Sequence, residues 1–223
     1  MVGSRAMTLD PDLKTLNAWR SGDQKAAGEL LNKFLPQIRR VVARKVPDEA
    51  IESVVDRVLD GLIKGHQSFR AQSKVRTYIL TITKNSIADF HRHRARQPEI
   101  DVLESSVRDL GISPSGLLLE KENRRLLLEA LRSIPLRDQI LLELYLWEDM
   151  TAPELAEIFD CGVPTIRSRI RRAKERLSKE AREFLEDERE LVDTLTDLDD
   201  WLRQVREELR PSYFAELRKN KET

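Results

Sequence analysis

The stretch that decides the fold is Met150–Leu177, MTAPELAEIFDCGVPTIRSRIRRAKERL. Its apolar residues recur at helical spacing in two runs, which Asp160-Cys161-Gly162 separates. We expect Gly162 to supply the unusual backbone angles of the turn, because glycine adopts conformations that are closed to other residues. Pro164 is tolerated in the first turn of the second run, where its missing N–H costs little. The stretch therefore predicts a helix-turn-helix.

The second predicted helix is strongly basic. Between Thr165 and Arg176 it carries six cations against one acid, Glu175. A helix of this kind can enter the major groove of DNA, where its cations meet phosphates. The apolar positions Val163, Ile166, Ile170 and Leu177 are predicted to face inward. The candidate DNA-contacting residues are Pro164, Thr165, Arg167, Ser168, Arg169, Arg171, Arg172 and Lys174. A solvated basic helix without a DNA role is the alternative.

The rest of the chain predicts an all-α fold. Only 5% of the 223 residues are aromatic, 35% are charged, and the apolar residues follow a 3.6-residue period. We expect helical segments over 12–96 and 117–180, which form two small domains joined by a flexible linker over 97–116. A structureless stretch of that length inside one compact domain would be unusual, which favours a domain boundary. Residues 181–223 are predicted to form an acidic helical extension.

Charge is segregated along the chain although the net charge is zero. Residues 180–223 hold 14 acids and 8 Lys or Arg, a balance of −6, so residues 1–179 carry +6. A basic body with an acidic tail is typical of a nucleic-acid binder that carries an interaction or regulatory segment. Within that tail, leucines and a valine from Leu191 to Leu209 repeat at steps of three and four, which predicts a coiled-coil-like seam. The seam packs either on the chain's own DNA-binding domain or on a partner, including a second copy.

Enzymatic and metal chemistry find no support in the sequence. We find no nucleophile–base pairing, no phosphate-binding glycine loop and no metal-spaced cluster, so no catalytic residue, metal or cofactor is expected. Cys161 is the single cysteine, and His91 and His93 lie among basic residues, which disfavours a metal site. No apolar run approaches the roughly 18–20 residues of a membrane span. We therefore expect a cytoplasmic protein without membrane insertion.

The second domain resembles region 4 of bacterial RNA polymerase sigma factors, specifically the small extracytoplasmic-function (ECF) class. The matching positions are Ile134-Pro135, Glu154-Leu155-Ala156 and Val163-Pro164-Thr165-Ile166-Arg167-Ser168-Arg169. In that family this helix recognises the −35 promoter element. Similar motifs also occur in response-regulator output domains, so this domain alone does not decide the family.

The first domain resembles sigma region 2 over Ser68–Arg96, SFRAQSKVRTYILTITKNSIADFHRHRAR. In the family this segment opens the −10 element and holds the exposed strand. Melted bases need a cationic groove and a stacking surface, which these residue types supply. The candidate −10 contacts are Lys74, Arg76, Thr77, Tyr78, Lys84, Asn85, Asp89 and Arg92. Tyr78 replaces the usual tryptophan, and a packed core aromatic is the alternative for it.

The helix before this segment departs from the family pattern. It normally carries the polar residues that grip the polymerase clamp, and here the aligned run Ser53–Leu59 keeps the apolar positions but not the polar ones. The candidate core polymerase contacts are Val54, Val55, Asp56, Val58 and Leu59. The core-binding surface is therefore expected to be altered, or adapted to a diverged clamp, within the same class.

The resemblance implies a sigma factor that binds core RNA polymerase and promoter DNA, recognises a −35 element and melts a −10 element. The resemblance leaves open whether the chain also binds an anti-sigma factor or associates with a second copy through the C-terminal helix. The alternative is a stand-alone helix-turn-helix regulator that binds duplex DNA as a dimer. An adaptor that binds polymerase without melting promoters is a third reading.

Overall fold

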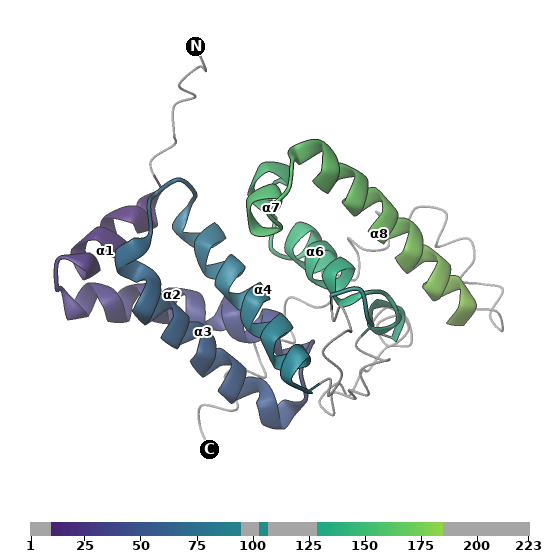
Figure 1. The fold of residues 1–223 in the computed structure, drawn as a ribbon, viewed down its shortest axis with the longest axis horizontal. Coiled ribbons are helices and arrows are strands. Elements are labelled where there is room, and N and C mark those ends of the chain that lie inside the picture. The colour runs from purple at the N-terminus through teal and green to yellow at the C-terminus, as the bar shows by residue number, and fades with distance from the viewer. Residues whose placement is uncertain (1–9, 95–102, 107–128, 185–223) are drawn as a thin grey trace, which may run out of the picture. The chain divides into compact units, whose positions relative to one another are not determined.

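The computed structural model describes residues 10–94, 103–106 and 129–184 of the chain, and all regular elements in these ranges are helices. This agrees with the predicted all-α class. The predicted seam over 191–209 lies outside the described residues. The elements are α1 (Pro11–Arg20), α2 (Gln24–Ala43), η1 (Asp48–Ala50), α3 (Ile51–Gly65), η2 (His66–Ser68), α4 (Val75–Arg94), α6 (Leu136–Leu146), α7 (Ala152–Ile158) and α8 (Val163–Phe184), drawn in Figure 1.

The described residues divide into two compact units. The first contains α1 to α4 together with Pro153–Gly162, which holds most of α7. The second contains residues 103–106, α6 and α8, and in it residues 129–133 are also helical. We describe each unit by itself.

Three helices of the first unit, α1, α2 and α4, begin at aspartate side chains that accept backbone hydrogen bonds. Asp23 accepts from the N–H groups of Lys25 and Ala26 at the start of α2, at 2.9 and 3.1 Å. Asp10 serves two helices. One carboxylate oxygen accepts from Asp12 N–H in α1 at 3.1 Å, and the other accepts from Val75 N–H at the start of α4 at 2.7 Å. Both aspartates thus satisfy donors that have no partner inside the helix.

The core of the first unit lies between α1, α2, α3 and α4. From α3 it receives Val54, Val55, Val58 and Leu62, all at most 3% exposed. Ile63 of the same helix is instead 49% exposed. The reason is geometric, since the 100° step from Leu62 carries Ile63 past the edge of the buried face.

His91 of α4 is a buried imidazole with one polar partner. It is 0% exposed, and its Nε2 lies 2.7 Å from the carbonyl oxygen of Lys45. Its Nδ1 is buried without a hydrogen-bond partner. Protonation would place an unsatisfied N–H and a charge in the core. Burial therefore lowers the pKa of His91 to about 4 from its ordinary 6.5, although the Lys45 carbonyl acts in the opposite direction.

In the second unit α6 packs against α8, and the two helices lie side by side in Figure 1. The core consists of Ile140, Leu141 and Leu144 of α6 with Ile166, Ala173 and Leu177 of α8, all at most 1% exposed. Helix α8 continues through Phe184, past the boundary at residue 180 that the sequence suggested. Leu103–Ser106, from the predicted linker, lie against the start of α6, with a β-bridge between Ser106 and Pro135.

His91 gives a testable pH dependence of stability. The folded pKa of about 4 lies below the unfolded 6.5, so the unfolded chain binds the proton more readily and stability falls as pH drops through this window. Between pH 7 and pH 5 this residue should cost about 2 kcal/mol of unfolding free energy. Urea denaturation at both pH values measures this loss. His91→Gln should reduce it, whereas His93→Gln, at an exposed position, should retain it. Equal losses in both variants would contradict this role of His91.

Candidate nucleic-acid interfaces

The turn between α7 and α8 is closed by a Schellman motif. Asp160 N–H donates to the carbonyl oxygen of Glu157 at 3.3 Å, and Cys161 N–H donates to that of Ala156 at 3.0 Å. The residue in the left-handed conformation is Asp160, with a φ of 47°. The expectation that Gly162 fills this role is therefore wrong. Aspartate tolerates the left-handed region better than most side chains, so the turn forms without glycine there.

Helix α8 has a buried apolar face and, on the opposite side, an exposed polar face. Ile166, Ile170 and Leu177 are buried, as predicted, while Val163 is half-buried. None of the eight candidate −35 residues is buried. Pro164, Thr165, Arg167, Arg171 and Arg172 are exposed, and Ser168, Arg169 and Lys174 are half-buried. The polar face is thus available to a ligand along its length.

A buried carboxylate on α6 holds α8 in place. The Asp138 side chain is 3% exposed and accepts a hydrogen bond from Arg176 of α8 at 2.5 Å. Lys174 also lies over the ring of Tyr145 in α6, 5.3 Å from its centroid. Because Asp138 lies in the first turn of α6, its negative charge is also favourable to the helix dipole. Sequence reasoning missed Asp138, since the sequence shows its acidity but not its burial.

The candidate −10 residues on α4 fall into two groups. Asn85, Asp89 and Arg92 are exposed on one helical face, with Asp89 and Arg92 paired in a salt bridge. Thr77 is 1% exposed and belongs to the core. Arg76 is half-buried and donates to the Gln37 side chain at 3.3 Å. The exposed group is the part of α4 that can meet a strand directly.

Two candidate lysines of the first unit already have partners there. Lys74 forms a 2.8 Å salt bridge with Glu154, whose hydrogen bond and charge raise the pKa of Lys74. Lys84 donates to the carbonyl oxygen of Ile158 at 2.9 Å, and burial lowers its pKa. A strand that bound at either lysine would have to compete with these contacts.

Tyr78 is packed against the protein. Its ring centroid lies 4.8 Å from that of Phe69, and burial raises the pKa of its hydroxyl. A Cβ placed on Gly65 would come within 2.3 Å of the Tyr78 Oη, so the hydroxyl occupies the space that a larger residue would fill. This packing favours the core alternative for Tyr78 that the sequence left open. Gly65 was missed, because its role depends on the approach of a distant side chain.

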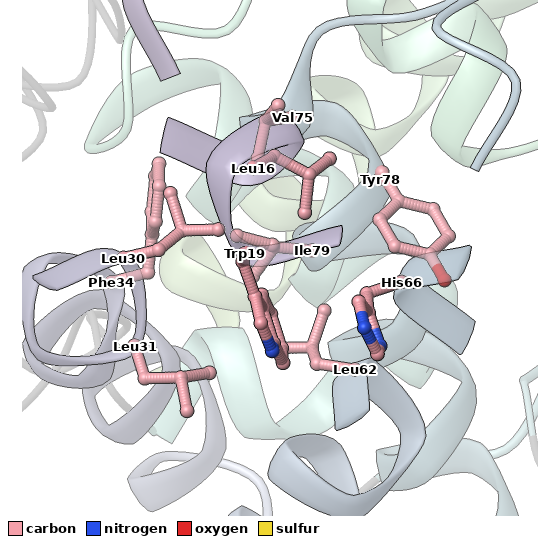
Figure 2. A pocket seen from close by; sticks show the side chains of 10 residues that line it. All are labelled: Leu16, Trp19, Leu30, Leu31, Phe34, Leu62, His66, Val75, Tyr78 and Ile79. Carbon is pink, nitrogen blue, oxygen red and sulfur yellow. The ribbon is translucent and has the colours of Figure 1, made fainter. Parts of the chain in front are cut away.

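Figure 2 shows the small hollow beside Tyr78, where Trp19 and His66 stack with ring centroids 4.2 Å apart. The accessible space among these side chains is about 10 Å³. This is room for about one water molecule, so the hollow is too small to receive a flipped base.

The candidate polymerase contacts on α3 differ in burial. Val54, Val55 and Val58 are at most 1% exposed, and their side chains form the core. Asp56 is exposed and Leu59 half-buried, so these two are the ones that a partner can reach.

The described residues contain no group of three or more His, Cys, Asp or Glu side chains arranged to hold a metal ion. Within the same ranges, no helix is long and apolar enough to cross a membrane.

The contact between Asp138 and Arg176 predicts a stability effect. Asp138→Asn should lower the unfolding free energy by about 2 kcal/mol, because a charge-assisted hydrogen bond at a buried carboxylate is lost. Glu175→Gln is the matched control, since it removes the exposed Arg171–Glu175 pair and should cost under about 0.5 kcal/mol. Chemical denaturation of both variants compares them. Equal losses would show that Asp138 contributes no more than a surface charge.

The close approach of the Tyr78 hydroxyl to Gly65 predicts a second effect on stability. Gly65→Ala should destabilise the protein by about 1–3 kcal/mol through overpacking. Adding Tyr78→Phe should recover much of this loss, because the ring carbon Cζ would remain 3.7 Å from the new methyl group. Gly28→Ala, in α2 with nothing within 4 Å of its Cβ, should be neutral or stabilising. Thermal unfolding of the four variants tests this, and a Gly65→Ala variant as stable as Gly28→Ala would contradict it.

Comparison with known proteins identifies both domains. Residues 30–97 match the family described as Sigma-70 region 2, and residues 124–177 match Sigma-70, region 4. Together the two matches cover more than half of the chain. The ECF RNA polymerase sigma-E factor of Escherichia coli strain K12 is 26% identical over 175 residues, 74% of this chain and 92% of the relative. That of Haemophilus influenzae is 26% identical over 165 residues, 70% and 87% of the two chains.

Two solved structures share the fold. CnrH, in complex with the cytosolic domain of CnrY, aligns with a TM-score of 0.53 at 20% identity, over 75% of this chain and 95% of that one. The sigma factor RpoE, in complex with the anti-sigma factor NepR from Bartonella quintana, aligns with a TM-score of 0.53 at 22% identity, over 74% and 99%. A stand-alone regulator is not favoured, because the first domain also matches a sigma region. The chain belongs to the sigma-70 family, in its ECF class, and is a promoter-recognising sigma factor.

Proposed function

We propose that this sigma factor contacts its promoter through two separate helices. The exposed face of α8, from Pro164 to Lys174, binds the −35 element. The exposed face of α4, with Asn85, Asp89 and Arg92, holds the −10 strand. The observation that carries the proposal is that none of the eight candidate residues on α8 is buried, while the opposite face of that helix is fixed on α6. The domains proposed for these roles are residues 12–96 and 117–180, with 97–116 as their linker.

Core RNA polymerase is the proposed protein partner, and the outer face of α3 is its proposed contact. That face offers Asp56, Leu59 and the 49% exposed Ile63. The buried valines of α3 support the face from inside. Its mix of charge and exposed apolar surface is suited to a protein interface.

Because the chain belongs to the sigma-70 family, we propose two further properties for it. The protein acts as an initiation subunit without catalytic chemistry of its own, and it works in the cytoplasm, where polymerase and promoters are. The likeness to CnrH and RpoE, which were solved with CnrY and NepR, supports an anti-sigma factor as a regulatory partner. Self-association through residues 191–209 is the competing use of the C-terminal extension.

The test is transcription from a promoter library by purified core polymerase, with and without the protein. Transcripts that appear only with the protein and share −35 and −10 sequences would support the proposal. Duplex binding at paired half-sites in the absence of polymerase, without such transcripts, would reject it in favour of a dimeric regulator.

A variant of α8 tests the −35 assignment. Arg167→Ala should lower the preference for the cognate −35 sequence over a scrambled one by about 1–3 kcal/mol if Arg167 contacts a base edge. Arg182→Ala, at an exposed cation near the other end of α8, should leave this preference unchanged. Fluorescence anisotropy with both duplexes at fixed salt measures the difference. An equal loss of affinity for both duplexes would show that Arg167 contacts phosphate.

A further inference from the structure

Asp10 and Asp23 both cap helices of the first unit, but they use their carboxylate oxygens differently. At Asp23 one oxygen, Oδ1, accepts from two N–H groups of the same helix, α2. At Asp10 the two oxygens accept from two different helices. Its Oδ1 accepts from Asp12 N–H in α1, and its Oδ2 accepts from Val75 N–H, the first of α4. Asp10 thus joins the starts of two helices across 65 residues of sequence.

This double role requires an acceptor at both positions of the side chain. Both oxygens of a carboxylate accept hydrogen bonds, whereas an asparagine side chain offers one oxygen and an NH2 group that donates. Asp23→Asn therefore retains the acceptor that α2 needs, because asparagine caps a helix about as well as aspartate. Asp10→Asn can retain the acceptor for one helix but turns a donor toward the N–H of the other. The same substitution thus has different consequences at the two positions.

Asp10 is a fixed anchor, because α1 is packed into the unit. Asp12, in the first turn of α1, forms a salt bridge with Lys33 of α2. Leu16 and Trp19 of α1 are buried in the core. The position of the Asp10 carboxylate is therefore set by the packing of α1.

The other end of α1 contacts η2, which precedes the connection to α4. Trp19 stacks on His66 with the ring planes 5° apart (Figure 2). The Arg20 side chain donates to the carbonyl oxygen of Gln67 at 2.9 Å, and the Gln67 side chain donates to that of Arg20 at 3.1 Å. Helix α1 thus contacts the chain on both sides of residues 69–74.

The residues around the start of α4 include candidate contacts to the −10 strand. Lys74 and Arg76 stand on either side of Val75, and the carbonyl oxygen of Lys74 accepts from Tyr78 N–H at 3.1 Å. In the connection before them Ala71 has a left-handed φ of 53°. This conformation is costly for a residue with a Cβ and persists where the surrounding structure fixes it. The contacts of α1 on both sides of the connection supply such fixed ends.

We propose that Asp10 is a positioning residue for the −10 strand. Its bond to Val75 N–H fixes the first turn of α4 and so places Lys74 and Arg76 for contact with the strand. Lys74 exchanges its salt bridge with Glu154 for a phosphate in this step, so its main chain must stay in place while its side chain changes partner. The −10 role of α4 rests on the proposed function, whereas the bond itself does not.

The charge of Asp10 has the opposite effect on strand binding from its hydrogen bond. Glu154 raises the pKa of Lys74 most, and the charge of Asp10 adds to this, so the Asp10 carboxylate acts on this ammonium. A carboxylate near a DNA-binding cation repels phosphate, and its neutralisation alone should strengthen strand binding. Weaker binding by Asp10→Asn therefore reports lost positioning.

Holoenzyme reconstituted from core RNA polymerase and the full chain tests this role. Fluorescence anisotropy measures binding to a promoter template with an exposed −10 strand and to a duplex that carries only the −35 element. Asp10→Asn and Asp10→Ala should both weaken binding to the first template about fivefold, as the loss of a helix cap predicts, and leave binding to the second unchanged. Asp23→Asn, the matched control, should change neither.

Hydrogen exchange in the full chain tests the bond without DNA or polymerase. The amide of Val75 should exchange about tenfold faster in both Asp10 variants, because its acceptor is lost. The amide of Asp12 should exchange faster only in Asp10→Ala, since the asparagine side chain still caps its own helix. Ile87, buried in α4, is the internal reference, because unchanged exchange there shows that α4 stays folded.

Three results would overturn the positioning role alone. They are strand binding by Asp10→Asn that equals or exceeds that of the unaltered protein, equal weakening on both templates, and protection of the Val75 amide that survives Asp10→Ala. Failure of the unaltered holoenzyme to bind the exposed strand would overturn the proposed function and this role with it.

Discussion

A chain built from helices must satisfy the backbone groups at every helix end, and this constraint shapes both units. Asp10 and Asp23 accept from the first turns of three helices. Asp160, in the left-handed conformation, ends α7. The carbonyl oxygens of Leu103 and Ser105 accept from the first two N–H groups of α6, where no side chain caps the helix. The apolar faces hold the helices together, but these ends fix where each helix starts and therefore which residues each face presents.

The two helices proposed to bind DNA present different kinds of surface. Helix α8 has a continuous exposed polar face backed by a fully apolar one, as a rigid reader of duplex DNA requires. Helix α4 is more buried. Three candidate residues on it or directly before it, Lys74, Lys84 and Tyr78, are engaged inside the first unit. If the proposed roles hold, recognition of the −35 element would use a face of α8 that is already exposed, whereas binding at these three residues would require their present contacts to be exchanged.

The faces of the helices could be predicted from the sequence, because the 3.6-residue period records which side is buried. That period correctly placed Ile166, Ile170 and Leu177 of α8 inside. It could not show that Asp160 rather than Gly162 is left-handed, since both residue types tolerate that conformation. Tyr78 approaches Gly65, and Asp138 is buried, only because separate helices meet in the folded chain. The local sequence pattern therefore could not predict either feature.

The double use of Asp10 has a consequence for exchanging modules between sigma factors. The match to Sigma-70 region 2 begins at residue 30, which would suggest a cut at that point. Yet the first N–H of α4 is bonded to a carboxylate 20 residues before that cut. A chimaera joined at residue 30 would receive α4 without the carboxylate that accepts a hydrogen bond from its first N–H. A segment transferred in order to carry α4 should therefore begin before α1, so that it includes Asp10.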